Sequence, residues 1–419
     1  MTEFKPYFTA DGSTGLYNSD FNDIYHSATG ALTEAYEKFI YPINFEMINK
    51  KNEIKILDIC YGIGYNSKSF LNYILDKKFL KNYFSDNKTS FATIYTDNIF
   101  KNFLKKIHIN NNTCNETIYT DNILRKISIT AVDNDEKLFF LSPFIKTGQR
   151  KISVPKNLPI NSKFYNNSKQ ISKRKINKLI NFLIFEKISS EIIQNKGVLS
   201  ILSNENFKDY FETDLRGYVL NLVKEHCTNP KLSNLHNIYY RYLSKCYKMQ
   251  LKRTNLDKVY FNYKIDDARS VVRDDKNEYN LIFLDAFSPN KCPCLWSYEF
   301  FTELYRILEK DGMLLTYSTS AVVRSAMIEA GFIVGNVYNE RLNKFTGTVA
   351  VKNSELIKYP LTEFDFGLLK TRAGIFYRDK NLNGQNEAII ELYNLEKKNS
   401  IRESSTQYIK NYTHNKDLP

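Results

Sequence analysis

The sequence lacks the features that would direct a protein to a membrane or out of the cell. Its first residues, MTEFKPYFTADG, contain no basic stretch followed by an apolar one, so no secretory signal is predicted. No apolar run approaches the roughly 20 residues that a membrane-spanning helix requires. We therefore expect a cytoplasmic protein without a membrane partner.

Cysteine spacing excludes a disulfide framework. The six cysteines form no CxxC pair and follow no regular interval, which favours a reducing compartment. Cys292 and Cys294 form a C-x-C pair, but a zinc site needs further ligands at a suitable spacing. No metal is expected.

Linkers rich in Pro, Gly or Ser are also lacking, which favours one domain over residues 1–419. Positive charge is unevenly distributed within it. Residues 146–253 contain 21 Lys or Arg against 7 Asp or Glu, and the whole chain carries +13. Aromatic residues are interleaved with this charge, as on surfaces that bind RNA. A solvated, lysine-rich insertion without a partner is an equally good interpretation.

Two apolar runs end in an acid. Residues 281–289 read LIFLDAFSP, and residues 54–66 read IKILDICYGIGYN. Such runs are typical of buried parallel strands that present a carboxylate at the carboxyl edge of a sheet, where open α/β sheets bind ligands. Further strands are expected at 127–133, 259–265 and 313–318, with a turn at 310–312 before the last, and helices at 31–39, 297–308 and 321–330. The fold class predicted is α/β with a mostly parallel sheet.

Two insertions are expected in this sheet. The ribose-binding acid of a dinucleotide fold lies about 20 residues after the glycine loop. Asp133 instead follows Gly64 by 69 residues, which predicts an insertion at about 78–127. Asp97 is a rival for the same role. The basic segment forms a second, mostly helical insertion at about 144–256.

The glycine turn and the strand-end acids suggest a cofactor. Gly62 and Gly64 permit a sharp turn into a helix, but Ser67 stands where a third glycine would complete a pyrophosphate fingerprint. A cationic, phosphate-free nucleoside suits four carboxylates. S-adenosylmethionine, with its sulfonium, amino acid moiety and ribose, fits this description. The four acids are Asp58, Asp133, Asp267 and Asp285.

Several motifs resemble one family. FNDIYHSATGALTEAYEKFI at 21–40, LDICYGIGYN at 57–66, DDAR at 266–269, DAFSPNKCPCLW at 285–296, TYSTSAVVRSAMIEAGF at 316–332 and TRAGIFYRD at 371–379 are similar to segments of the tRNA 5-methylaminomethyl-2-thiouridine methyltransferase family. This family is the methyltransferase half of the bifunctional MnmC enzymes. The resemblance implies a Rossmann-like class I methyltransferase that uses S-adenosyl-L-methionine and acts on tRNA.

The implied reaction methylates the exocyclic amine of 5-aminomethyl-(2-thio)uridine at the wobble position, U34. A separate enzyme would then make the aminomethyl precursor. No flavin is expected, because no segment resembling the oxidase half follows. The sequence departs from the family pattern at four positions: Asp58 replaces a glutamate, Cys60 and Asp266 replace glycines, and Phe376 replaces a proline.

The resemblance also implies roles for individual residues. Asp285 would orient the acceptor amine and accept its proton, or would only cap the following turn. Trp296 would stack on a base or anchor the core. Cofactor binding is expected of Asp58, Tyr61, Gly62, Gly64, Asn66, Asp133, Asp267 and Ala268, and substrate binding of Tyr25, Ser27, Phe287, Pro289 and Trp296.

Two other classes of protein remain. An aminopropyltransferase of the spermidine synthase type has the same fold and a related cofactor, but it does not need the basic insertion. A non-catalytic RNA-binding protein would account for the charge, but not for four strand-end acids.

Overall fold

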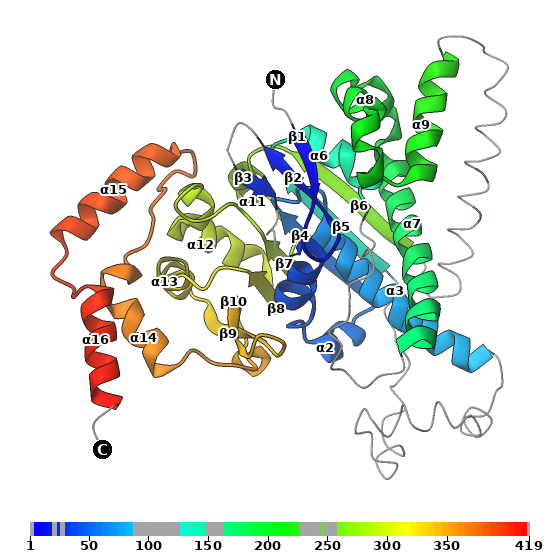
Figure 1. Cartoon of the computed structure of the whole chain (residues 1–419). Coiled ribbons are helices and arrows are strands. Elements are labelled where there is room, and N and C mark those ends of the chain that lie inside the picture. The colour runs from blue at the N-terminus through cyan, green and yellow to red at the C-terminus, as the bar shows by residue number, and fades with distance from the viewer. Residues whose placement is uncertain are drawn as a thin grey trace.

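A seven-stranded sheet forms the centre of the structure, a computed structural model (Figure 1). The structure describes residues 4–18, 23–25, 30–86, 126–146, 162–226, 241, 245 and 258–416. The strand order is β6-β5-β4-β7-β8-β10-β9. The first five strands are parallel, and β10 is antiparallel to β8 and β9. The strands are β4 (Glu53–Ile59), β5 (Lys126–Asp133), β6 (Lys258–Ile265), β7 (Tyr279–Leu284), β8 (Leu308–Thr316), β9 (Ile333–Asn339) and β10 (Lys344–Val351).

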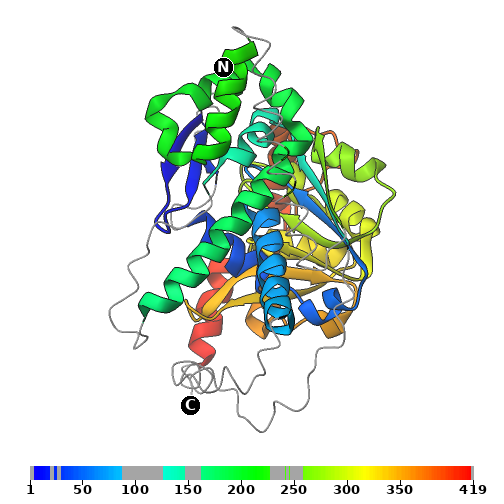
Figure 2. The ribbon, with the colours of Figure 1, turned by 90° about the vertical axis from the view of Figure 1, so that its right-hand side faces the viewer.

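Helices cover both faces of this sheet, because the central strands are apolar on both sides. In β7, Leu281 and Phe283 face one core, while Ile282 and Leu284 face the other. Figures 1 and 2 show α3 (Tyr65–Asp86) and α7 (Ser162–Gln194) on one side and α12 (Tyr298–Ile307) and α13 (Ala321–Glu329) on the other. The mostly parallel α/β sheet predicted from the sequence is confirmed.

The strand order reverses next to β4, and this reversal positions the site. From β4 the chain builds outward through β5 and β6, then returns to add β7 and β8 on the opposite side. Ligands of open α/β sheets bind at the carboxyl ends of the strands where such a reversal occurs. The predicted acids Asp58, Asp133 and Asp285 lie at or just beyond the ends of β4, β5 and β7.

One predicted turn is wrong. Residues 310–312 lie within β8, which starts at Leu308. Tyr279 of β7 pairs with Leu308, but Leu281 pairs with Met313, so three extra residues of β8 bulge out of the ladder. Gly312 is needed there, since a Cβ atom would lie 2.9 Å from the carbonyl oxygen of Tyr279.

Part of the basic segment forms helices, of which α7 packs beside α3 (Figure 2). These elements are α7, α8 (Lys196–Ser203), η3 (Glu205–Tyr210) and α9 (Thr213–His226). The segment is tied to the core just after β5: the Glu212 N–H donates to the Phe144 carbonyl over 2.6 Å, and Lys146 N–H donates to Tyr210 over 3.1 Å. Residues 87–125, which include Asp97, lie outside the described residues.

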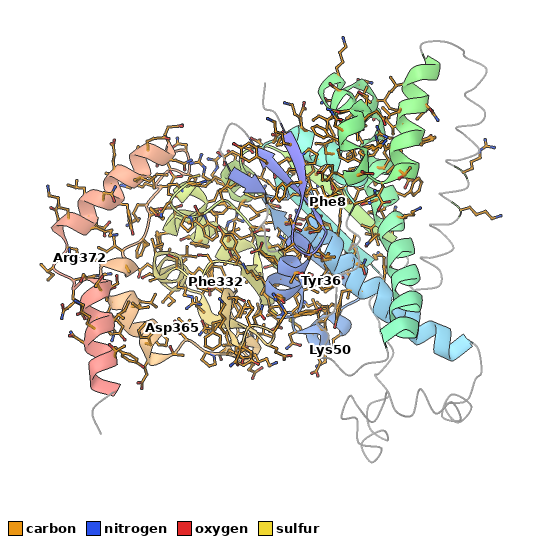
Figure 3. All side chains as sticks on the ribbon, in the orientation of Figure 1. Phe8, Tyr36, Lys50, Phe332, Asp365 and Arg372 are labelled. Carbon is orange, nitrogen blue, oxygen red and sulfur yellow. The ribbon has the colours of Figure 1, made fainter. Side chains whose placement is uncertain are left out.

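A buried arginine holds the sheet to its C-terminal helices. Arg324 of α13 donates to Thr348 of β10 over 3.0 Å, to Asn336 of β9 over 2.6 Å and to Asp365 of α14 (Glu363–Lys370) over 3.0 Å. Figure 3 labels Asp365 at this junction. The arginine of the AVVRSAMIEAGF segment therefore fixes the far edge of the sheet.

The remaining elements lie at the two ends of the chain and between the strands. The N-terminal segment forms a separate antiparallel sheet, β1-β2-β3, which the sequence analysis did not predict. No described helix has the length and apolar character needed to cross a membrane. The other elements are β1 (Phe4–Phe8), β2 (Thr14–Asn18), β3 (Asp23–Tyr25), α1 (Ala31–Glu34), η1 (Ala35–Ile40), α2 (Phe45–Asn49), α6 (Glu136–Leu141), η2 (Ser142–Phe144), α11 (Ala268–Asp274), η5 (Pro293–Trp296), η6 (Ser354–Leu356), α14 (Glu363–Lys370), η7 (Arg372–Gly374), α15 (Asn386–Asn399) and α16 (Ser405–Lys416).

Candidate active site

A cavity of about 460 Å³ opens at the carboxyl ends of β4, β5 and β7. Its volume lies in the range of small-molecule and cofactor sites. It is lined by Glu34, Cys60, Gly62, Val132, Asp133, Asn134, Asp266, Asp267, Ala268, Arg269, Asp285, Ala286, Phe287, Ser288, Lys291, Cys292, Cys294, Leu295, Tyr317 and Asn386.

The glycine turn after β4 forms one wall. Gly62 lines the cavity and has φ 56°. Gly64 does not line it; a Cβ atom there would lie 2.2 Å from the Tyr61 hydroxyl oxygen, so only glycine fits. The Tyr61 ring points into the core, where it stacks on Phe139 with 5.0 Å between ring centroids. Tyr61 and Gly64 thus shape the turn and are not among the lining residues, in contrast to the contacts expected of them.

Asp58 lies beneath this turn and is fully buried. One carboxylate oxygen accepts hydrogen bonds from the Ser67 hydroxyl over 2.5 Å and the Ser67 N–H over 3.2 Å. No described residue donates a hydrogen bond to the other oxygen. Burial raises the pKa of Asp58 to about 8, and the negative charge of Asp285 adds to this rise. Asp58 does not line the cavity, so its expected direct contact with the cofactor has no support in the geometry.

Asp133 ends β5 and lines the cavity. It accepts hydrogen bonds from the Gly62 N–H over 2.8 Å and the Asp135 N–H over 3.1 Å. Burial raises its pKa to about 6, although the Gly62 hydrogen bond opposes the rise. The carboxylate therefore links the glycine turn to the end of β5, in the place expected of a ribose-binding acid.

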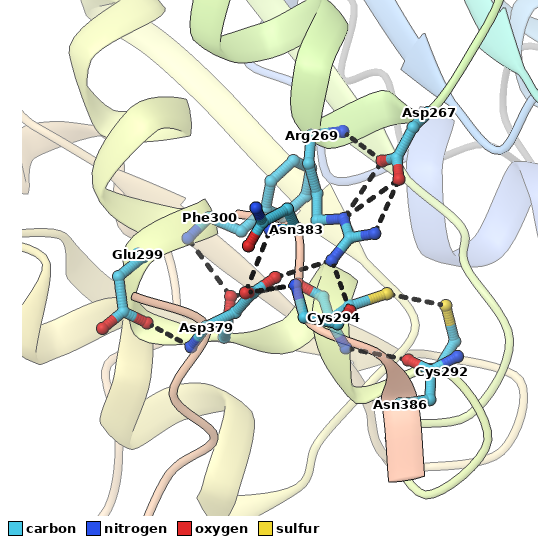
Figure 4. Close-up of polar contacts among 11 residues, drawn as sticks. Asp267, Arg269, Cys292, Cys294, Glu299, Phe300, Asp379, Asn383 and Asn386 are labelled. Carbon is cyan, nitrogen blue, oxygen red and sulfur yellow. Dashed lines mark hydrogen bonds and ion pairs between the residues drawn. The ribbon is translucent and has the colours of Figure 1, made fainter. Parts of the chain in front are cut away.

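Asp267 and Arg269 form a second wall, together with the C-terminal part of the chain (Figure 4). Asp267 caps α11, accepts from the Arg269 N–H over 2.8 Å and forms an ion pair with the guanidinium over 2.6 Å. Arg269 also pairs with the buried Asp379 over 2.7 Å and donates to the Gly384 carbonyl over 2.8 Å. The DDAR and TRAGIFYRD segments therefore meet, and Asp267 is both a helix cap and a lining residue.

Asp285 follows β7 and lines the cavity beside Glu34 and Tyr317. It accepts a hydrogen bond from the Asn66 amide over 2.9 Å. Burial raises the pKa of Asp285 to about 7; the negative charge of Glu34 adds to the rise, while the Asn66 hydrogen bond and the charge of Lys38 oppose it. Asn66 does not line the cavity, so the structure supports a role in positioning Asp285 rather than direct contact with the cofactor.

Only some of the residues expected to bind substrate line the cavity. Phe287 lines the cavity, but Pro289 does not. Trp296 is fully buried and donates from its indole N–H to the Phe287 carbonyl over 2.9 Å, so it anchors the core and the loop. Tyr25 lies in β3, but the structure does not describe its side chain, and Ser27 lies outside the described residues.

Several residues of the cavity were not predicted from the sequence. Glu34 and Tyr317 lie in segments that resemble the family, at positions that carried no distinct chemical signal. Asn386 lines the far wall from α15, which was not predicted. Cys60 carried the clearest signal, because it replaces a glycine; its φ of 59° is unusual for a residue with a side chain.

The cavity suits a cationic nucleoside. Asp133, Asp285 and Glu34 line it, and Asp58 lies directly beneath with an unpartnered carboxylate oxygen. Buried carboxylates favour an opposite charge in their neighbourhood, because it offsets the cost of removing them from water. The residues present therefore fit S-adenosylmethionine, whose sulfonium and ammonium groups are positive.

Comparisons with known proteins agree with this chemistry. Residues 229–353 match the family described as S-adenosyl-L-methionine-dependent methyltransferase. MJ0670 of Methanocaldococcus jannaschii is 31% identical over 155 residues, which cover 34% of this chain and 43% of that protein. The tRNA 5-methylaminomethyl-2-thiouridine biosynthesis bifunctional protein MnmC of Aliivibrio fischeri is 26% identical over 142 residues, 32% of this chain and 21% of that protein. The chain thus spans less than half the length of these curated relatives.

A solved structure shows the same fold. MNMC2 of Aquifex aeolicus superposes with a TM-score of 0.50 and 19% identity, covering 96% of this chain and 87% of that one. Residues 229–353 are thus similar to S-adenosyl-L-methionine-dependent methyltransferases, and the mostly parallel α/β sheet agrees with that match. The chain's resemblance to the methyltransferase half of MnmC, predicted from the motifs, is confirmed by these matches.

Asp133→Asn tests the cofactor site. The asparagine keeps an oxygen that can accept from Gly62, but it removes the charge that a ribose hydroxyl would bond to. We expect S-adenosylmethionine to bind about 10-fold more weakly, as for the loss of one hydrogen bond to a charged group. Titration calorimetry measures this, with exposed Asp274→Asn as control. Unchanged affinity would remove Asp133 from the cofactor site.

Proposed function

We propose that the protein methylates the exocyclic amine of 5-aminomethyl-(2-thio)uridine at the wobble position of tRNA, yielding 5-methylaminomethyl-(2-thio)uridine. The observation that carries this proposal is the placement of Asp285 in the cavity wall, held by Asn66 and next to Glu34. The DAFSPNKCPCLW segment that begins at Asp285 and the MnmC-named relatives support the choice of substrate. An enzyme that installs the aminomethyl group must act first.

Several residues would hold the cofactor. Gly62 and Ala268 offer close approach to the backbone, Asp133 offers a carboxylate to the ribose, and Asp267 lies beside them in the wall. S-adenosylmethionine supplies an electrophilic methyl group to this site. The protein's own task is then to align the acceptor amine and keep its lone pair free.

Asp285 suits that task. An alkylamine is mostly protonated at neutral pH, so it must lose a proton before it can attack. A carboxylate with a pKa of about 7 is matched to accepting that proton, because a general base works best when its pKa lies near the working pH. Asn66 fixes one oxygen of the carboxylate, and Phe287 borders the space beside it.

The direct test uses purified protein, S-adenosylmethionine and tRNA that carries 5-aminomethyl-2-thiouridine. Nucleoside digestion and mass spectrometry should show conversion to the methylaminomethyl nucleoside. Decarboxylated S-adenosylmethionine with a diamine, tested in parallel, should give no product. Aminopropyl transfer in that second reaction, without tRNA methylation, would overturn the proposal.

Asp285→Asn separates chemistry from cofactor binding. The amide keeps the shape of the side chain but cannot accept a proton. We expect kcat to fall by about 100-fold or more, the usual contribution of a general base, while the affinity for S-adenosylmethionine stays within a few fold. Asp311→Asn, in the exposed bulge of β8, is the control. Lost cofactor affinity with normal kcat at saturation would make Asp285 a cofactor ligand instead.

Substitutions of two neighbours of Asp285 should shift the pH dependence of kcat/KM in opposite directions. Activity needs the ionised carboxylate, so kcat/KM should rise with pH through a pKa of about 7. Glu34→Gln removes a charge that raises this pKa, so this rising limb of the kcat/KM profile should shift to lower pH. Asn66→Ala removes a bond that lowers it, so the limb should shift to higher pH. Profiles that coincide for both variants would show that Asp285 does not control the limb.

The basic segment should bind tRNA phosphates. Charge reversal at Lys173, Arg174, Lys175 and Lys178, which lie in α7, should weaken tRNA binding and flatten its dependence on salt, since fewer counterions are released. Reversal at the exposed Lys380, Lys398, Arg402 and Lys410, which lie in the C-terminal part of the chain outside this segment, is the matched control. Affinity measured at two salt concentrations tests this, and parallel slopes for all three proteins would exclude the segment from tRNA binding.

A further inference from the structure

Three thiols lie in the wall of the cofactor cavity: those of Cys60, Cys292 and Cys294. The sulfur atoms of Cys292 and Cys294 are 3.6 Å apart (Figure 4). Two reduced cysteines in contact can be joined after a small movement, because a disulfide bond needs a sulfur–sulfur distance of about 2.05 Å.

The two cysteines are held differently. Cys294 is buried at the start of η5, where its N–H donates to the Asn386 side chain over 3.4 Å and its carbonyl accepts from Ser297 over 3.0 Å. Cys292 is half-buried, and its N–H donates to the Ser288 carbonyl over 3.0 Å. Cys292 therefore belongs to the loop that carries Phe287 and Ser288. That loop must move together with Cys292 if the two sulfur atoms form a bond.

Exposure favours Cys292 as the thiol that reacts first, because Cys292 is half-buried whereas Cys294 is buried. The pKa of Cys294 is raised, chiefly by its hydrogen bond with Cys292 and then by burial. The Cys294 thiol therefore keeps its proton. Thiolates are the nucleophilic form of cysteine, so the more exposed partner is also the reactive one.

Neither thiol takes part in the proposed methyl transfer. The roles proposed for that transfer fall to Asp285, Asn66 and Phe287. The pair therefore adds a property to the cavity that the methyltransferase reaction does not require.

We propose that Cys292 and Cys294 form an oxidative modification site at which hydroperoxides produce a disulfide that closes the cavity to S-adenosylmethionine. The Cys292 thiolate attacks a peroxide oxygen, the O–O bond breaks, and a sulfenic acid forms. The Cys294 sulfur then attacks the Cys292 sulfur, the S–O bond breaks, and water leaves. With hydrogen peroxide, the two thiols lose two electrons and two protons, and the peroxide becomes two waters.

The consequence follows from the geometry. Closing the gap from 3.6 Å draws Cys292 toward the fixed Cys294, and with it the loop that lines the cavity at Phe287 and Ser288. Cofactor affinity should then fall at least about 10-fold. Because both sulfurs line the cavity, bound S-adenosylmethionine should shield them from the oxidant.

The test treats the full chain with hydrogen peroxide, with and without saturating S-adenosylmethionine. Peptide mapping should find a Cys292–Cys294 disulfide, formed more slowly with the cofactor present. Calorimetry should show the loss of cofactor affinity, and dithiothreitol should restore it. Cys292→Ser and Cys294→Ser should each have the same affinity before and after peroxide, whatever their starting value.

Cys60→Ser is the matched control, since it removes the third thiol of the wall and keeps the pair. It should still form the disulfide and lose affinity on oxidation. Two outcomes would overturn the proposal. One is a disulfide or an irreversible oxidation that maps to Cys60 rather than to the pair. The other is a fully formed Cys292–Cys294 disulfide with unchanged affinity for S-adenosylmethionine.

Discussion

The burial of three carboxyl groups at one edge of the sheet constrains the whole site. Asp58, Asp133 and Asp285 end adjacent strands, and among the described residues their hydrogen bonds come from neutral donors: Ser67, the backbone at Gly62 and Asp135, and Asn66. Burial raises the pKa of each. Among the described residues the charge of Lys38 acts on Asp285, but no hydrogen-bond donor to the three carboxyl groups is positively charged. A cationic ligand is therefore their natural complement.

This arrangement couples ligand binding to proton release. A cation that enters the cavity favours the ionised form of each carboxyl and lowers its pKa. At a pH near the values of Asp133 and Asp285, part of the population is protonated before binding and must lose that proton. In the proposed reaction, the same event would place Asp285 in the charged state that a base requires.

Much of the sheet and part of the site could be predicted from the sequence. The apolar runs of β4, β5 and β7 end in acids, and this pattern alone places Asp133 and Asp285 at one crevice. The orientation of individual side chains could not be predicted in the same way. Tyr61 is next to Gly62, yet its ring packs on Phe139, which is 78 residues later in the sequence. Asp58 has the right position along its strand but lies under the turn rather than in the cavity.

Long-range pairings account for the other differences. The bulge at 310–312 depends on the register between β7 and β8, and local sequence shows only a turn-forming Gly312. Trp296 could be a stacking platform or a core anchor until its indole is seen bonded to the Phe287 carbonyl. The strands of the N-terminal sheet are short and of mixed polarity, so their sequence alone does not predict them. The sheet is recognised from the pairing of β1 with β2 and of β2 with β3.

The ion pair between Arg269 and Asp379 has a consequence for biosynthesis. The wall of the cavity is completed by residues that emerge late from the ribosome: Asp379 and Gly384 fix Arg269, and Asn386 forms part of the lining. β4 and its glycine turn are made more than three hundred residues earlier. During translation Arg269 therefore lacks Asp379 and Gly384 until nearly the whole chain has been made. A nascent chain stopped before Asp379 would contain every strand of the central sheet but would lack Asn386 of the cavity wall and the residues that hold Arg269.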